Sequence, residues 1–246
     1  MIYFANGTLF GTPNAGNLAP NPTPMKFGFL QDISVELSGD SKQLFGQYQY
    51  PVDTARGKTK ITWKAKFAQI NGKLFNDLFF AETMTTPMNL VAVDEAAAIP
   101  ASPFTVTVAN SAKFVEDKGV VDVSTGHQLV KVASAPATGQ YSVSAGVYTF
   151  AAADTGKAVL INYTYNAATG VGMRIPITNH LMGFGPIFSM TLTNAYKGQN
   201  LSMTLNACRA EKLAFATKQD DYMIPEIDGS AFADASNNIG YLDLSE

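Results

Sequence analysis

Two segments of this chain alternate strictly between apolar and polar side chains, and this pattern limits the possible folds more than any other feature. In residues 32–38 every second side chain is apolar, and the same alternation recurs in residues 58–67. Successive side chains of a β-strand point to opposite faces of a sheet, so each segment predicts a strand with one buried face. We expect the two strands to share a sheet. Its polar face would carry the charged residues Asp32, Glu36, Lys58, Lys60, Lys64 and Lys66.

A short amphipathic segment follows the second strand. Asn71 can cap a helix, and large apolar residues recur around and after it at helical spacing. These residues are Ile70, Leu74, Phe75, Leu78 and Phe79. The pattern predicts a short helix that packs on the apolar face of the sheet and closes the core.

The composition favours a mainly β protein. Only 15% of the 246 residues are charged, whereas glycine (20), tyrosine (10) and phenylalanine (16) are plentiful, which suits strands and turns better than long solvated helices. The net charge of −3 argues against a protein that binds nucleic acid tightly by coating it with positive charge. No stretch approaches the roughly 18 consecutive apolar residues that span a membrane, and residues 1–6 lack the features of a signal peptide. We therefore expect a soluble protein without a membrane partner.

Changes in composition along the sequence predict a discontinuous domain with an insertion. Residues 1–27 are punctuated by glycine and proline and predict an extended arm. Residues 96–170 lack methionine and tryptophan and hold short β segments separated by turns, which predicts a small inserted β-sandwich-like domain. The first domain would thus comprise 1–95 and 171–246. In its second part, we expect a hairpin around Lys197-Gly198-Gln199-Asn200 and further strands at 213–216 and 222–227.

The sequence shows no catalytic or metal-binding pattern. Cys208 is the only cysteine, so an intrachain disulfide is impossible, and a buried structural role is the simplest interpretation. His127 and His180 have no Cys, Asp or Glu at ligand spacing. Asp154-Thr155-Gly156-Lys157 lacks the upstream glycine and the following Ser or Thr of a phosphate-binding loop, so it predicts a turn. We expect no catalytic residue, no metal, no cofactor and no enzymatic activity.

The connection between the two alternating strands is the strongest candidate for a functional surface. Residues 38–57 form a connection of about twenty residues, longer than most structureless loops in compact domains. It carries the apolar residues Leu44, Phe45, Tyr48 and Tyr50, with Arg56 near its end. Such a loop either folds back on its own domain or docks on a neighbouring subunit. Enrichment in aromatic residues favours docking.

Charge is unevenly distributed along the chain. The basic residues from Arg56 to Lys73 have no acidic residue among them, whereas the segment after Lys218 is acidic. Opposite charges on opposite surfaces would favour head-to-tail stacking of copies. Equally, the lysines of 58–66 can pair across the sheet with Asp32 and Glu36. Both can hold, and we expect the lysines either to be offset by carboxylates or to lie at subunit contacts.

Two parts of the chain resemble the major tail tube proteins of tailed bacteriophages. Residues 46–68, followed by Leu78-Phe79-Phe80, are similar to the stretch in which a long aromatic loop leads into a Lys/Thr-alternating strand and a helix with a Leu-Phe pair. Residues 183–196 and 206–213 match as well, so the resemblance covers about residues 27–92 and 170–246. It implies a tail-tube-type β-sandwich or barrel with one short helix on the sheet.

The same resemblance implies a structural role in the virion. Six copies would form a ring whose inner sheets make a continuous β-barrel, and the loop of 38–57 would reach the adjacent ring. Stacked rings, assembled in the host cytoplasm, would surround the tape measure protein, meet tail terminator and baseplate proteins, and let DNA pass through the lumen without specific binding. The 96–170 insertion would decorate the outside. Contractile and non-contractile tails both stay open, and so does the face of strand 58–67 that lines the lumen.

A second function class is a β-sandwich module that binds a carbohydrate or receptor on a virion. The turn-rich insertion and its tyrosines support this alternative, because exposed tyrosines commonly form binding surfaces. They are Tyr141, Tyr148, Tyr163 and Tyr165. An enzyme is the third alternative, and it would need a convergent set of polar groups that the sequence does not display.

Overall fold

The computed structural model describes residues 7–14, 22–217 and 219–245, and across them the chain is mainly β-structure with one short helical segment between β4 and β5. The chain divides into two compact units. Unit 1 comprises Met1–Thr83 and Ile175–Glu246, and unit 2 comprises Met84–Arg174. The expected boundary at 95/96 differs because it would cut β5 (Asn89–Ala98), which pairs with β11 (Ala158–Asn166) inside unit 2.

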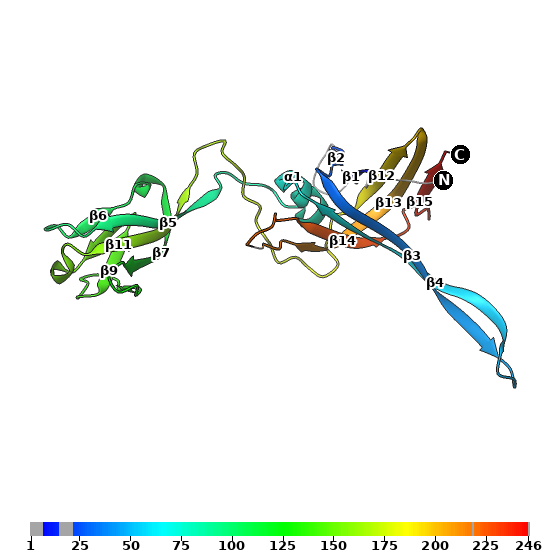
Figure 1. The fold of residues 1–246 in the computed structure, drawn as a ribbon, viewed down its shortest axis with the longest axis horizontal. Helices are drawn as coiled ribbons and strands as arrows, with labels where there is room; N and C mark the ends of the chain where they lie inside the picture. Colours follow the sequence, from blue (N-terminus) through cyan, green and yellow to red (C-terminus); the bar gives the residue numbers. More distant parts are fainter. Residues whose placement is uncertain (1–6, 15–21, 218, 246) are drawn as a thin grey trace. The chain divides into compact units, whose positions relative to one another are not determined.

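Unit 1 is built on one antiparallel sheet, which has eight strands in the described part of the chain (Figure 1). Its strand order is β2-β1-β12-β13-β14-β4-β3, and β15 pairs with β13 beside β14. The strands are β1 (Thr8–Pro13), β2 (Met25–Lys26), β3 (Leu30–Phe45), β4 (Pro51–Phe67), β12 (Phe188–Tyr196), β13 (Gln199–Ala214), β14 (Glu226–Ala231) and β15 (Gly240–Leu244).

The two alternating segments form neighbouring strands of this sheet, as predicted. Val35 lies opposite Trp63 and Ile33 opposite Ala65 in the β3–β4 register, so the apolar residues share one face. That face holds the core of the unit. Its buried residues are Leu9, Met25, Phe27, Trp63, Ala65, Phe67, Leu74, Phe75, Leu78, Phe188, Met190, Leu205, Cys208 and Ile227.

The predicted helix also forms and closes this core. It begins as α1 (Gly72–Phe75) and continues as the π-helical turn η1 (Asn76–Phe80). The Asn71 side chain accepts hydrogen bonds from the backbone N–H groups of Lys73 (3.0 Å) and Leu74 (3.2 Å), which is the expected cap.

The expected N-terminal arm is corrected by the structure in its described part. Strand β1 pairs with β12 along its whole length, and Leu9 is fully buried. Gly11, which suggested a loop, lies where a Cβ atom would come within 2.9 Å of Leu78 Cδ1. Because Gly11 has no side chain, Leu78 fits beside the strand in the core, and the strand continues through Gly11. Residues 1–6 and 15–21 of the expected arm lie outside the described residues.

The expected loop of 38–57 is also corrected, because most of it is strand. Strands β3 and β4 continue as a two-stranded hairpin from Gly39 opposite Thr59 to Phe45 opposite Pro51, and only residues 46–50 form the turn. In this extension each strand pairs one backbone edge with the other strand, and neither face of the hairpin is buried. The absence of alternation in 39–57 therefore concealed a strand pair.

The second part of unit 1 follows the prediction in its hairpin. Strands β12 and β13 are joined by Lys197 and Gly198, which both have positive φ angles (50° and 80°), as a tight hairpin turn requires. The expected strands at 213–216 and 222–227 are shifted: β13 ends at Ala214, and β14 begins only at Glu226.

Unit 2 consists of two small sheets around a separate core. In this part of the chain, which is fully described, β6-β10-β9-β8 form one sheet and β5-β11-β7 the other. The remaining elements are β6 (Thr105–Thr107), η2 (Ser111–Lys113), β7 (Phe114–Asp122), β8 (Val130–Lys131), β9 (Gln140–Ser144), β10 (Val147–Phe150) and η3 (Ala152–Asp154). Val120, Tyr148 and Ile161 are fully buried in this core.

Candidate assembly surfaces

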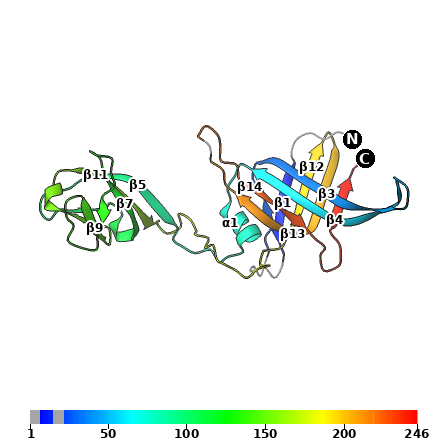
Figure 2. The same cartoon turned by 90° about the horizontal axis from the view of Figure 1, so that it is seen from below.

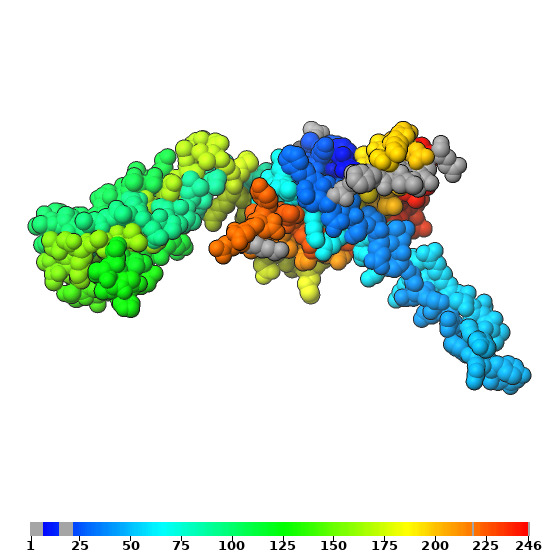
Figure 3. All heavy atoms as spheres, viewed as in Figure 1, coloured from blue at the N-terminus to red at the C-terminus, as the bar shows by residue number. Residues whose placement is uncertain are grey.

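The β3–β4 hairpin extends beyond the strands that flank it. Strand β14 pairs with β4 only from Ile61 to Lys66, so the segment of β4 before Ile61 has β3 as its strand partner among the described residues. Figures 1 and 2 show the hairpin running past the rest of unit 1, and Figure 3 shows it as a projection. Strand β3 is the last strand of the sheet, which leaves its outer backbone edge open within the described sheet.

The tip of the hairpin is a cluster of exposed apolar side chains. Tyr48 and Tyr50 expose 75% and 81% of their surface, and the flanking apolar residues are exposed as well. We define the tip as Leu44, Phe45, Tyr48, Tyr50 and Val52. Of the two alternatives for this segment, folding back on its own domain is therefore contradicted. An exposed aromatic cluster of this kind is typical of an interaction site.

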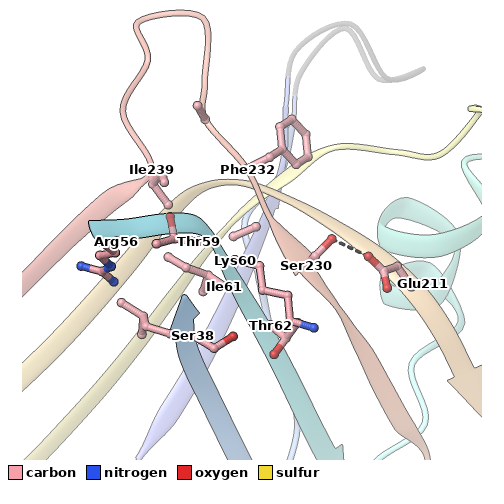
Figure 4. A pocket seen from close by; sticks show the side chains of 13 residues that line it. Ser38, Arg56, Thr59, Lys60, Ile61, Thr62, Glu211, Ser230, Phe232 and Ile239 are labelled. Atoms are coloured by element: carbon pink, nitrogen blue, oxygen red, sulfur yellow. Dashed lines mark hydrogen bonds between the residues drawn. The ribbon is translucent and has the colours of Figure 1, made fainter. Parts of the chain in front are cut away.

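Arg56 is separated from this tip. Arg56 lies opposite Ser41 in the register. Its Nε atom lies beside Gly39, 3.2 Å from the position that a Cβ atom of this glycine would occupy. Its side chain lines a cavity of about 690 Å³ where β4 diverges from β14 (Figure 4). Leu37, Ile61, Phe232 and Ile239 form the apolar part of the lining. The structure thus brings Leu44, Phe45, Tyr48 and Tyr50 together but places Arg56 at a different surface.

The charged face of the sheet is an ion-pair network centred on Glu226 of β14. The Nζ atoms of Lys64 and Lys212 lie 2.9 Å and 2.8 Å from Glu226 Oε1, and Lys66 Nζ lies 3.9 Å from Oε2. Lys212 Nζ also lies 3.7 Å from Asp228 Oδ2. The strand register explains this convergence, because Glu226 lies opposite Lys66 and Asp228 lies opposite Lys64.

This network changes the electrostatic interpretation of the strand. Lys212 above all, followed by Lys64, lowers the pKa of Glu226 to about 2. The ion pairs of Lys64 and Lys66 in the described structure run to β14 and not to Asp32 or Glu36 of β3. Part of the acidic C-terminal segment is therefore engaged inside its own subunit, which weakens the expectation that it attracts the lysines of a neighbour.

Another member of the acidic segment has a structural role as well. Asp234 accepts hydrogen bonds from Asn206 Nδ2 (2.8 Å) and from the backbone N–H groups of Ser236 and Asn238 (2.9 Å each). Where β14 flanks β4, the charged face carries Lys64, Lys66 and Lys212 together with Asp32, Glu36, Glu226 and Asp228. The carboxylates of this set offset its lysines. Lys58 and Lys60 precede Ile61, so both lie beyond β14, and both are exposed.

A second exposed apolar surface lies at the opposite end of the β3–β4 pair, and sequence reasoning missed it. Ile177, Leu181 and Met182 are almost fully exposed (82%, 91% and 103%), and Phe184 is half exposed. With Phe79 and Phe80 they line a groove of about 310 Å³, which we call the base groove. The signal in the sequence is the run Leu181-Met182-Gly183-Phe184, which places large apolar residues in a segment without strand or helix periodicity.

The tyrosines of unit 2 belong to its core. Tyr141, Tyr148 and Tyr163 are at most 2% exposed. The hydroxyls of Tyr141 and Tyr148 donate to Asp117 (2.8 Å and 3.0 Å), and burial together with this carboxylate raises the pKa of both. The Tyr163 hydroxyl donates to Glu95 (2.6 Å), and Tyr165 packs against the same core. These residues do not form a binding surface.

The residues that were considered for catalysis have structural environments. Cys208 is fully buried, and burial raises the pKa of its thiol to about 12. Asp154 is fully buried and pairs with Lys157 (2.7 Å). It also accepts a hydrogen bond from the backbone N–H of Gly139 (2.8 Å), so it stabilises the local turn structure. The backbone N–H of His127 donates to Thr125 Oγ1 (3.3 Å). Across the described ranges, no group of three or more His, Cys, Asp or Glu side chains could hold a metal ion.

Comparison with known proteins adds no relative. No protein-family model matches the chain, and no curated protein matches its sequence. No helix in the described ranges is long and apolar enough to cross a membrane. The functional interpretation therefore depends on the surfaces of unit 1.

Proposed function

We propose that this protein is the structural subunit of a bacteriophage tail tube, with no catalytic role. Copies assemble into hexameric rings, the rings stack head to tail, and the resulting hollow conduit carries the genome during ejection. The observation that carries this proposal is a regular hairpin whose aromatic tip is largely exposed to solvent. A monomer gains nothing from such a tip, whereas a repeating assembly buries it in every copy.

The open sheet edges support ring formation. Strand β3 ends the sheet on one side with a backbone edge of 16 residues. On the other side, β2 covers β1 only at Phe10 and Gly11. Open edges favour pairing with further chains, and a closed ring joins each edge to the next copy and leaves none exposed. The number of six copies comes from the resemblance.

The balanced charges of the sheet face are compatible with a conduit. Each phosphate that a protein neutralises releases close to one counterion, so a repeated uncompensated lysine would hold DNA strongly. Here Lys64, Lys66 and Lys212 lie within ion-pair distance of Glu226. Whether this face lines the lumen or meets a neighbour, its carboxylates offset its lysines, and DNA contacts in the lumen stay weak. The tape measure protein, the tail terminator and the baseplate proteins would be the other partners in the virion.

The alternative of a carbohydrate- or receptor-binding virion protein loses one of its two supports from the sequence. The turn-rich insertion was one support, and Tyr141, Tyr148, Tyr163 and Tyr165 were the other. The first three of these tyrosines are buried with their hydroxyls bonded inside unit 2. No specific observation in the described residues favours this function over assembly.

Size-exclusion chromatography and negative-stain electron microscopy of the purified protein test the proposal. We expect rings or hollow fibres of uniform width whose fraction increases with protein concentration. A species that stays a monomer or small oligomer at every concentration contradicts the proposal and favours a binding module.

A further inference from the structure

The two exposed apolar surfaces of unit 1 lie at opposite ends of one long strand. The tip adjoins Pro51, where β4 begins, and the helix that carries Phe79 and Phe80 follows Phe67, where β4 ends. Strand β4 has 17 residues, which corresponds to about 55 Å at ~3.3 Å per residue. Because the paired hairpin holds the tip at the far end, the tip cannot reach the base groove of its own subunit.

The base groove is held in place by a chain of specific contacts. Asn76, which is 5% exposed, accepts the backbone N–H of Glu82 (3.1 Å) and donates to its carbonyl oxygen (2.8 Å). The Glu82 carboxylate lies 2.7 Å from His180 Nε2, and the His180 ring stacks on Phe184 with a centroid distance of 3.8 Å. Hydrogen bonds from Thr178 and His180 lower the pKa of Glu82. The exposed segment 177–184 is thus anchored to the end of the helix.

The chemistry of the groove matches that of the tip. Residues 177–184 contain no acidic residue, lysine or arginine, and neither do residues 44–52. The groove is lined mainly by apolar side chains, and Glu82, Thr178 and His180 contribute its polar groups. A tyrosine has the same combination of an apolar ring and a polar hydroxyl. Tyr48 and Tyr50 of the tip are therefore well suited to this groove.

We infer that the base groove is the receptor for the hairpin tip of a second copy of this chain. The inference rests on the proposed function and identifies the partner surface of the tip. A contact between two different surfaces of identical chains is heterologous, and it repeats without limit when the surfaces lie at opposite ends. The exposed part of the tip amounts to on the order of 500 Å² of apolar surface, given about 150–250 Å² for each aromatic side chain. Every internal copy in a stack would bury both its tip and its groove.

Disulfide trapping tests this contact directly. The variant Tyr48→Cys/Leu181→Cys carries one thiol on each surface, and native Cys208 is buried and does not compete. Under mild oxidation we expect a ladder of dimers, trimers and longer species on a non-reducing gel, because each chain can link to two others. Tyr48→Cys/Tyr241→Cys is the matched control, since Tyr241 is also exposed (61%) but lies on β15. No ladder, or an equal ladder in the control, overturns the inference.

A second variant separates this inference from the proposed function. Leu181→Ser/Met182→Ser removes two exposed side chains, so the subunit is expected to fold normally. We expect the concentration needed for half-assembly into fibres to increase by on the order of 10-fold or more, because central apolar contacts dominate interfaces. If the wild type forms fibres and this variant forms them equally well, the groove is not the receptor but the tube proposal stands. If the wild type forms neither rings nor fibres, the proposed function fails and the inference fails with it.

Discussion

At the scale of single residues, close approaches of the backbone decide where the sheet of unit 1 can form. A Cβ atom at Gly229 of β14 would lie 2.1 Å from the Arg209 carbonyl oxygen and 2.8 Å from Trp63 Cζ2. A Cβ atom at Gly11 of β1 would likewise lie 2.9 Å from Leu78 Cδ1. Gly11 was interpreted as a loop residue in the sequence, yet both glycines let strands pass close to large core side chains. Their role depends on three-dimensional neighbours, so the sequence alone cannot reveal it.

Gly229→Ala tests this close approach. The added methyl group would force β14 away from β13 and Trp63, and overpacking of this kind costs about 1–3 kcal/mol. We expect a lower free energy of unfolding in urea, without a change in the folded structure at low denaturant. Gly72→Ala is the control, because a Cβ atom at this helical position would meet no atom within 4 Å. Equal stability of the two variants would show that the tight contact is unimportant.

Glu226 provides the second test at this scale, through pH. Its pKa falls from 4.5 to about 2 because Lys212 and Lys64 stabilise the carboxylate in the folded state. A lowered folded-state pKa contributes stability above the unfolded-state value, and this contribution is lost as the pH falls through the folded-state value. We expect wild type to be more stable than Glu226→Gln at pH 7 and the difference to shrink between pH 4.5 and about 2. A difference that is independent of pH in urea titrations would contradict the assignment.

The partners of the lysines show the limit of residue-level prediction. The sequence offered two alternatives for Lys64 and Lys66. They would pair with Asp32 and Glu36 across the sheet, or they would lie at a contact with a neighbouring subunit. The structure supplies Glu226 instead. Because β14 begins four residues later than the expected strand at 222–227, the register that brings Glu226 opposite Lys66 could not be read from a single sequence.

At the scale of elements, predictions succeeded where one face of the chain is buried. Residues 32–38, 58–67 and 71–80 have one apolar side that packs on the core, and their strands and helix were predicted from periodicity. Residues 39–57 have no buried side, so they form strands without any periodic signal. Their aromatic residues pointed to a candidate interaction surface, and the structure shows that these side chains are exposed. The base groove was missed because its residues lie outside regular structure.

The double variant Phe45→Ser/Tyr48→Ser tests the role of the tip. Both side chains are exposed (56% and 75%), so their removal costs the monomer little. We expect an unchanged melting temperature and no stacking of rings in sedimentation and electron microscopy. Val130→Ser, which changes an equally exposed residue of unit 2, should leave both properties unchanged. A large loss of stability in the double variant would show that the tip belongs to the core of its own subunit.

At the scale of the whole molecule, the candidate assembly surfaces all belong to unit 1. The tip, the β3 edge and the base groove lie in Met1–Thr83 and Ile175–Glu246. Unit 2 has its own core around Tyr148 and Ile161. Thr85 and Arg174, the residues near its two ends, exchange backbone hydrogen bonds (2.9 Å and 2.8 Å). The insertion therefore leaves and rejoins the chain at neighbouring positions.

Removal of unit 2 tests this division. Replacement of residues 86–173 by a short Gly/Ser linker connects Thr85 to Arg174, which already lie side by side. We expect the shortened chain to fold and to form rings with the same number of subunits, because the core of unit 1 and its exposed surfaces are retained. Circular dichroism and electron microscopy report the two properties. A folded variant that no longer assembles would place an essential contact in unit 2.

The most direct test of the account is a cryo-electron microscopy reconstruction of the purified, concentrated wild-type protein. We predict closed rings of six subunits in which β3 pairs with the sheet of the next copy and each hairpin tip lies buried against a neighbouring ring. Isolated subunits whose hairpins remain in solvent at every concentration would contradict the central claim that this chain finds its partners in copies of itself.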